Sequence, residues 1–322
     1  MASATTGISF VVVARNEERR LPLCLDSISR LQLLDCEVIC VNSESTDGTL
    51  EVMHAYQTRF SQFRLLSPIR CRNAAAARNA GKSAASRDAI FFVDGDVQLS
   101  RGFVEAAIRE LEDPEVSAVT GGLDEILYDD ESGQVLRGSY VRHSFGEKTK
   151  VMSCGGILLV RRSIAELIGD YDERFYVNED IDYALRITEK HTLIALPLSM
   201  GTHHTSEYRD RSWLHVRNGY VVNQGMLARK HMRRPGFWQY WYKSRKSYVW
   251  GGAAIVLLLL ALSVFLCGEL PLAGLLLLLL TVMISQSLIA LFRRKGIWSS
   301  FVLTWLCPPL VLWGFAVEPW VD

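Results

Sequence analysis

Residues 89–96 read Ala89-Ile90-Phe91-Phe92-Val93-Asp94-Gly95-Asp96, five apolar residues followed by two carboxylates that flank a glycine. A continuous apolar run of this length is typical of a strand that is buried on both faces of a sheet. Because residues two apart on an extended chain point the same way, we expect Asp94 and Asp96 to converge on one hard cation. A solvated turn with two acids would give the same pattern, so this motif alone does not identify a metal site.

Strands and helices alternate around this run. Apolar, β-branched residues predict strands at 8–14 and 37–42, and the polar residues 43–48 lead to a helix that begins at Thr49. The alanine-rich residues 74–86 predict a further helix. This alternation predicts an α/β fold with a mostly parallel central sheet and helices on both faces. Ligands bind beyond the carboxyl ends of the strands in such sheets, which is where Asp94 and Asp96 stand.

A second group of acids, Asn178-Glu179-Asp180-Ile181-Asp182, opens another predicted helix. Carboxylates in a first turn commonly do no more than complement the helix dipole, with Asn178 as the cap. The functional alternative is that one of them is a general base for a hydroxyl group. Farther along, His203-His204 would supply an imidazole ligand to a metal or be two ordinary histidines.

Taken in order, these motifs resemble family 2 glycosyltransferases, which have the GT-A fold. The resemblance covers about residues 7–230 and lies in five blocks. They are a strand ending in Asn16-Glu17-Glu18, the turn at Val41–Thr49, Ala77-Arg78-Asn79-Ala80-Gly81 with Asp94-Gly95-Asp96, Gly169–Phe175 with Glu179–Asp182, and His203–Ser206.

The resemblance implies an inverting, metal-dependent transferase with a nucleotide-sugar donor, a UDP-sugar being favoured. Asp180 would be the catalytic base. A divalent metal, Mg²⁺ or Mn²⁺, would be held by Asp94 and Asp96 with His203 or His204. The residues implied to bind the donor are Ala14, Asn16, Glu17, Asn42, Ser43, Asp47, Arg78, Asp94, Gly155 and Glu179. The family usually has acids at the positions of Asn42 and Ser43, so the nucleotide preference stays open.

The C-terminal part of the chain has a different composition. Residues 211–248 carry nine basic side chains, no acidic one and many aromatic rings, a mixture typical of a segment lying on a membrane surface. Three apolar stretches follow at 249–267, 270–292 and 297–317, each near the ~20 residues that a membrane-spanning helix needs. Nucleic acid would also suit the basic, aromatic mixture, but the adjoining apolar stretches favour a membrane and no nucleic acid.

We therefore predict a GT-A domain at 1–210, a membrane-interface segment at 211–248 and a transmembrane region at 249–322. Basic residues precede the first stretch and separate the second from the third (Lys243, Arg245, Lys246 and Arg293–Lys295), which predicts that the catalytic domain faces the cytoplasm. The start of the sequence lacks an export signal. The expected location is the inner (cytoplasmic) membrane, with several spans.

A membrane location predicts a membrane-borne acceptor, and we expect a lipid-linked saccharide in glycan or polysaccharide assembly. One alternative is transfer to a polyprenyl phosphate, which needs no base because the phosphate is already ionised. An alternative from another class is an inactive, membrane-anchored scaffold that binds a nucleotide sugar without turning it over. The intact Asp94, Asp96 and Asp180 argue against the scaffold.

Overall fold

The chain divides into two units, Met1–Glu207 and Tyr208–Asp322, in this computed structural model, and each unit is described by itself. The structure describes residues 7–67, 73–129, 132–206, 220–241 and 311.

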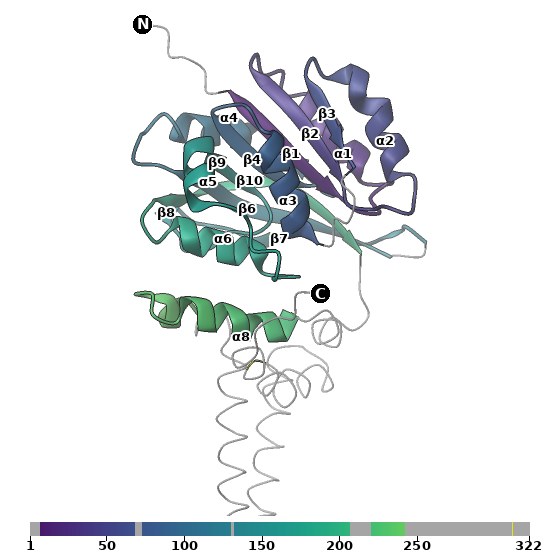
Figure 1. Cartoon of the computed structure of the whole chain (residues 1–322). Helices are drawn as coiled ribbons and strands as arrows, with labels where there is room; N and C mark the ends of the chain where they lie inside the picture. Colours follow the sequence, from purple (N-terminus) through teal and green to yellow (C-terminus); the bar gives the residue numbers. More distant parts are fainter. Residues whose placement is uncertain (1–6, 68–72, 130–131, 207–219, 242–310, 312–322) are drawn as a thin grey trace, which may run out of the picture. The chain divides into compact units, whose positions relative to one another are not determined.

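Ten strands of the described residues form one sheet in the first unit (Figure 1). Eight of them follow the order β3-β2-β1-β4-β9-β6-β10-β5, while β7 pairs with β6 and β8 with β10. Their bounds are β1 Ile8–Ala14, β2 Cys36–Asn42, β3 Phe63–Leu66, β4 Ala89–Asp94, β5 Val97–Leu99, β6 Ala118–Tyr128, β7 Val135–His143, β8 Thr149–Lys150, β9 Leu158–Arg161 and β10 Leu193–Ser206.

The half of the sheet formed by β3, β2, β1 and β4 is parallel, and it contains the strands predicted from their apolar runs. Ala14 pairs with Asn42, and Val13 pairs with Asp94, so these strands end at one edge. The other half is mixed, because β6 and β10 are parallel while β9 runs antiparallel to β4 and β6. The predicted α/β class is confirmed, and the edge where β1, β2 and β4 end is where the sequence motifs meet.

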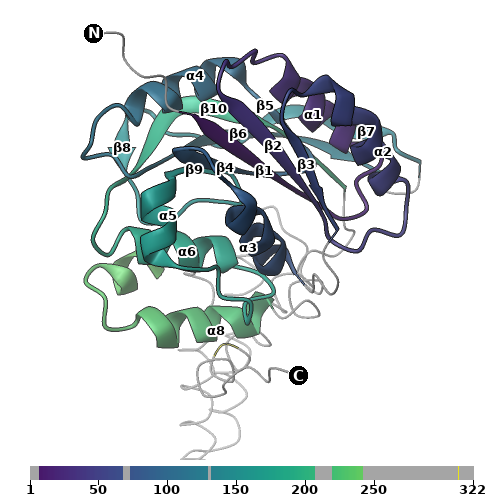
Figure 2. The same cartoon turned by 45° about the horizontal axis from the view of Figure 1, so that its top comes forward.

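Helices cover both faces of this sheet, as predicted (Figures 1 and 2). Phe10 and Val12 of β1 face a core with α1, α2 and α4, and Val11 and Val13 face a second core with α3, α5 and α6. This division follows from the alternation of side chains along a strand. The helices are α1 Leu21–Ser29, α2 Thr49–Tyr56, η1 Gln57–Arg59, α3 Ala74–Ala84, α4 Arg101–Glu110, α5 Arg162–Ile168 and α6 Glu179–Ile187.

The end of β4 differs from the extended segment that we expected at residues 94–96. The strand ends at Asp94, and Gly95 and Asp96 form a turn before β5. The Gly95 amide donates to the Val13 carbonyl at 2.8 Å, and a Cβ on Gly95 would lie 2.7 Å from the Ala14 Cβ. Close packing against β1 thus requires glycine here and turns the chain. The two carboxylates consequently face different neighbours.

The second unit contains α8, Tyr220–His231, which falls within the predicted interface segment. Beyond it Phe237 and Trp241 are buried, and Trp238 is about half exposed with its ring 5.4 Å from that of Phe237. Within the described ranges, no helix combines the length and apolar character needed to cross a bilayer. The three predicted spans lie outside the described residues except for residue 311, so they stay predictions.

Candidate active site

Arg78 of α3 joins two of the predicted motifs. Its side chain is only 3% exposed, and its guanidinium donates to Glu179 Oε1 at 2.5 Å and to Asp94 Oδ1 at 2.6 Å. Burial alone would lower the pKa of Arg78, but the charges of Asp94 and Glu179 outweigh it and raise that pKa. One permanent cation therefore holds the end of β4 against the start of α6.

Gly156 completes this contact from the loop before β9. A Cβ at this position would lie 2.2 Å from Asp94 Oδ2 and 2.6 Å from an Arg78 nitrogen. The residue must therefore be glycine for the Arg78–Asp94 pair to form as it does. We singled out its neighbour Gly155 as a donor-binding residue, but a Cβ on Gly155 would meet open space. Donor binding by Gly155 stays a prediction, and the packing shows that Gly156 is the glycine beside Asp94 and Arg78.

Three side chains of α3 and its cap hold the loop that leads to α6. Asn79 donates to the Tyr171 carbonyl at 3.0 Å and accepts from the Tyr171 amide at 2.8 Å. Asn73 donates to the Glu173 carbonyl at 2.7 Å, and Lys82 donates to the Gly169 carbonyl at 2.7 Å. These bonds satisfy a partly buried loop backbone and fix where α6 begins.

Asp180 lies in the first turn of α6, next to the Arg78 cluster. Its Oδ1 accepts from the Ile181 amide at 2.7 Å. Burial and the neighbouring charge of Glu179 raise the pKa of Asp180 to about 7, although Arg78 pulls it down. A carboxyl with such a pKa exchanges a proton near neutral pH, which suits a general base.

Asp96 faces a different partner, His203 on β10. The His203 Nε2 lies 2.9 Å from Asp96 Oδ2, and both side chains remain partly exposed. Burial alone would lower the pKa of His203, but the hydrogen bond and charge of Asp96 raise it. His204 points to the other side of the strand, with its Nδ1 2.8 Å from the Tyr128 hydroxyl. Of the two histidines left open by the sequence, His203 is the one beside Asp96.

Glu125 on β6 contacts the same histidine and was missed by the sequence analysis. It is 2% exposed, and its Oε1 lies 3.3 Å from His203 Nδ1. Burial would raise the pKa of Glu125, but hydrogen bonds and charges from Tyr140, Arg142 and His203 lower it instead. A glutamate in a strand carries no sequence signal of such a contact, because the contact depends on the pairing of β6 with β10.

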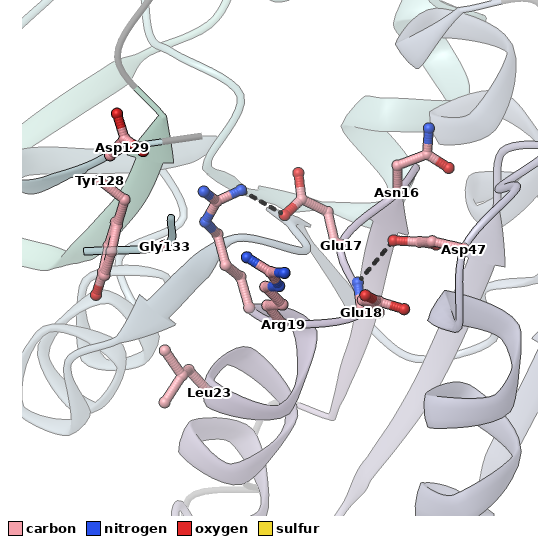
Figure 3. Close-up of a pocket in the computed structure, with 10 residues that line it drawn as sticks. Asn16, Glu17, Glu18, Arg19, Leu23, Asp47, Tyr128, Asp129 and Gly133 are labelled. Carbon is pink, nitrogen blue, oxygen red and sulfur yellow. Dashed lines mark hydrogen bonds and ion pairs between the residues drawn. The ribbon is translucent and has the colours of Figure 1, made fainter. Parts of the chain in front are cut away.

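Glu17 approaches Asp96 from the loop after β1. Its Oε2 is buried without a hydrogen-bond partner in the described part of the chain, and it forms a longer ion pair with Arg20 at 3.6 Å. Burial and the charge of Asp96 raise the pKa of Glu17. Glu17 also lines a cavity of ≈ 260 Å³ between this loop and the β6–β7 hairpin. Figure 3 shows Glu17 between Tyr128 on one side and Asp47 on the other.

The loops after β1 and β2 are tied together by residues that we expected to touch the donor. Asn16 Oδ1 accepts from the Thr46 amide at 2.8 Å. Asp47 Oδ2 accepts from the Glu18 amide at 3.2 Å, as Figure 3 shows. Asn16 has a φ of 58°, a conformation that asparagine tolerates better than most residues. Asn42 accepts from the Ser45 amide at 3.1 Å within the second loop. These side chains shape the rim of the site.

Two other predicted donor-binding residues stand where these loops meet. The Ser43 amide donates to the Ala14 carbonyl at 2.9 Å, so β1 and β2 end side by side. Glu179, also predicted to bind the donor, is instead turned toward Arg78. The structure thus brings Ala14, Ser43, Asp94 and the start of α6 to one edge of the sheet.

Asp96 and His203 fit a divalent cation of the predicted kind by their chemistry. A carboxylate oxygen suits both Mg²⁺ and Mn²⁺, and the imidazole nitrogen 2.9 Å from it favours a transition metal such as Mn²⁺ over Mg²⁺. No group of three or more His, Cys, Asp or Glu side chains arranged to hold a metal occurs among the described residues. Ligands from substrate phosphates would have to complete the coordination, as is common for Mg²⁺.

Comparisons with known proteins identify a family for this chain. The family model described as "Glycosyl transferase family 2" matches residues 9–168. "Glycosyltransferase AglE" of Haloferax volcanii is 22% identical over 196 residues, which are 59% of this chain and 64% of that protein. The chain thus spans less than two thirds of that relative's length.

Solved structures share the fold. S. aureus TarS 1–349 in complex with UDP-GlcNAc superimposes with a TM-score of 0.53 and 15% identity, over 72% of this chain and 75% of that one. GalNAc-T7 with UDP, GalNAc and Mn²⁺ gives a TM-score of 0.55 and 15% identity, over 76% of this chain and 51% of that one. At such identities the likeness concerns the fold, which is GT-A-like.

Proposed function

The chain belongs to glycosyl transferase family 2 through the domain at residues 9–168, and on this premise we propose that it moves a sugar from a nucleotide-sugar donor to a hydroxyl acceptor with inversion. UDP-sugars are the favoured donors, because structures of this fold have been solved with UDP-GlcNAc and with UDP. The acceptor is proposed to be a lipid-linked saccharide.

The observation that carries this proposal is the Arg78 bridge. It holds Asp94, from the end of β4, and Glu179, beside Asp180, on one guanidinium. Two motifs that are 85 residues apart thereby border one place, with Asp96 and His203 next along the same edge. A general base and a cation site close together are what sugar transfer from a diphosphate requires.

Asp180 would accept the proton of the acceptor hydroxyl as its oxygen attacks the anomeric carbon. A new carbon–oxygen bond forms on one face while the bond to the diphosphate oxygen breaks on the other, and the electron pair leaves with the nucleoside diphosphate. One base opposite the leaving group is enough, and a single displacement inverts the anomeric centre. The position of Asp180 at a helix N-terminus favours its carboxylate form, against the raised pKa caused by burial.

Asp96 and His203 would hold a divalent cation against the donor diphosphate. When bound, such an ion neutralises charge that develops on the leaving group. Arg78 keeps Asp94 and Glu179 in place, and Gly156 leaves the room for that pair. Arg78 donates to both carboxylates while buried, which supports a role in positioning them.

The membrane part of the proposal rests on composition. The three apolar stretches at 249–267, 270–292 and 297–317, together with the basic, aromatic residues 211–248, support attachment to the cytoplasmic face of a membrane. An acceptor carried by a lipid would then reach the enzyme by diffusion in the bilayer.

Release of the nucleoside diphosphate tests this function. The full chain is incubated with a panel of UDP-, GDP- and dTDP-sugars, with Mn²⁺ or EDTA, with and without lipid extract from membranes. We expect UDP release that needs Mn²⁺ and increases with the lipid extract, and no such release by Asp180→Asn. Donor binding without release under any condition would instead favour the inactive scaffold.

A further inference from the structure

Glu125 is a buried carboxylate that the proposed mechanism does not use. It lies on β6 opposite two residues of neighbouring strands, since Glu125 pairs with Tyr140 of β7 and with His203 of β10. Strand register therefore places these three side chains in one row across the sheet. A charged group at 2% exposure is costly unless other groups compensate it.

The two oxygens of Glu125 have different surroundings. Oε2 accepts a short hydrogen bond from the Tyr140 hydroxyl. Oε1 accepts from an Arg142 nitrogen at 2.9 Å and lies 3.3 Å from His203 Nδ1. Arg142 thus balances the charge of the carboxylate and Tyr140 hydrogen-bonds to it, while Oε1 also lies beside the histidine.

His203 stands between two carboxylates, with Nδ1 toward Glu125 and Nε2 at 2.9 Å from Asp96 Oδ2. A neutral imidazole has one N–H and one lone pair, and only the lone pair can bind a cation. Arg142 also lies 3.1 Å from Nδ1, and as a donor it would favour the opposite tautomer, with the proton on Nε2. Glu125 is the acceptor that opposes this effect.

We propose that Glu125 is a positioning residue that keeps the His203 proton on Nδ1 and so leaves Nε2 free for a divalent cation shared with Asp96. This inference rests on the proposed function, because it concerns the cation that the donor diphosphate would need. Histidines that bind metals commonly donate their second N–H to a carboxylate, and loss of that partner typically weakens metal binding by about 10- to 100-fold.

The test measures Mn²⁺ affinity in the presence of UDP, using the electron paramagnetic resonance signal of free Mn²⁺ and the full chain. Glu125→Gln keeps the size of the side chain but offers an amide donor to Nδ1, and we expect its Mn²⁺ Kd to rise at least about tenfold. Tyr140→Phe is the matched control, since it removes a hydrogen bond from the same carboxylate without touching His203. We expect it to change the Kd less than about threefold, within the range of a neutral hydrogen bond.

A double-mutant cycle separates positioning from a general structural effect. In a His203→Gln background, Glu125→Gln should cause no further loss of Mn²⁺ affinity. An equal loss in both backgrounds, or an unchanged Kd in the single variant, overturns the proposal. A wild-type chain that releases UDP from a UDP-sugar but binds no Mn²⁺ also overturns it, and leaves the transfer function standing.

Nitrogen-15 NMR of the wild-type chain gives a check that needs no variant. With Mg²⁺ and UDP bound, the His203 ring should show its proton on Nδ1. A proton on Nε2 under those conditions contradicts the proposal.

Discussion

Two carboxylate clusters at the same edge of the sheet differ in the groups that bind their carboxylates. Asp94 and Glu179 share Arg78, a cation that the chain supplies and buries. Asp96 and Glu17 lie near each other, Asp96 beside His203 and Glu17 beside a more distant Arg20, and burial together with the charge of Asp96 raises the pKa of Glu17. Both carboxylates of the first cluster hydrogen-bond to a buried guanidinium, whereas Glu17 Oε2 in the second is buried without a hydrogen-bond partner in the described part of the chain.

The difference indicates what each cluster is for. Charge that is always present is compensated by a fixed side chain, which also joins β4 to α6. Uncompensated charge costs stability in the free protein but provides affinity for a cation that arrives with the substrate. Such strain at a functional site is commonly balanced by stability elsewhere in the fold.

The largest effect is expected from Asp180→Asn, which removes the base and leaves the Arg78 bridge in place. Transfer should fall about a thousandfold, within the range for general-base catalysis. UDP affinity in the presence of Mn²⁺ should change little, because Asp180 is not part of the Asp96–His203 pair. Steady-state transfer rates and UDP titration measure the two quantities, and a variant with near wild-type turnover would exclude Asp180 as the base.

Arg78→Met breaks the first cluster directly. It leaves the carboxylates of Asp94 and Glu179 facing each other, and breaking a buried ion pair in this way costs about 3–5 kcal/mol. We expect the lower end, because the Asp94 side chain is 36% exposed and water can replace part of the contact. Arg78→Lys should recover only part of the loss, since an ammonium cannot span both acceptors as a guanidinium does.

Urea unfolding of the full chain, followed by circular dichroism, measures the effect of both Arg78 variants. Arg101→Met is the control, because the Arg101–Glu105 pair is exposed and is expected to contribute less than about 1 kcal/mol. Equal destabilisation by Arg78→Met and Arg101→Met would show that the bridge is not a structural element.

The pH dependence of transfer tests the protonation of Asp180, which lies beside the same cluster. The base must be ionised, and the pKa of Asp180 is raised to about 7, so kcat/KM should increase with pH and level off above about 7. Below that value the rate should fall about tenfold per pH unit. A profile that is flat between pH 5 and 8, with UDP binding unchanged, would contradict this role of Asp180.

Gly156→Ala should give the smallest effect of the series, because it disturbs the Arg78–Asp94 pair without removing a charge. The new Cβ would lie 2.2 Å from Asp94 Oδ2, so that carboxylate has to move. We expect a loss of about tenfold in kcat/KM, in line with a misplacement of a fraction of an ångström. Gly102→Ala adds the same methyl group where no atom lies within 4 Å and serves as the control.

Much of this arrangement is predictable from the sequence, because buried parallel strands and the motifs that follow them have local signatures. The strand over Ile8–Ala14 and the acids at the start of α6 were located in this way. Pairings between distant strands have no such signature. The contact of Glu125 with His203 therefore appeared only in the structure.

The directions of the site side chains were also not predictable from the sequence. Asp94 and Asp96 read as one motif, yet a turn at Gly95 sends the first toward Arg78 and the second toward His203. The resemblance predicts that Arg78 binds the donor, and the structure shows its guanidinium buried between two carboxylates. Both outcomes depend on packing between α3, β4 and α6.

The most direct test of the contrast between the clusters compares the Tm of Asp94→Asn and Asp96→Asn in the full chain, with and without Mn²⁺ plus UDP. Asp94→Asn should lower the Tm of the ligand-free chain, because Arg78 loses a charged partner. Asp96→Asn should lower that Tm less than Asp94→Asn does, because relief of the repulsion with Glu17 offsets part of the lost contact with His203, and it should abolish the increase in Tm caused by Mn²⁺ and UDP. A drop in ligand-free Tm for Asp96→Asn as large as that for Asp94→Asn, or a full Mn²⁺–UDP shift in the Asp96 variant, would contradict the account.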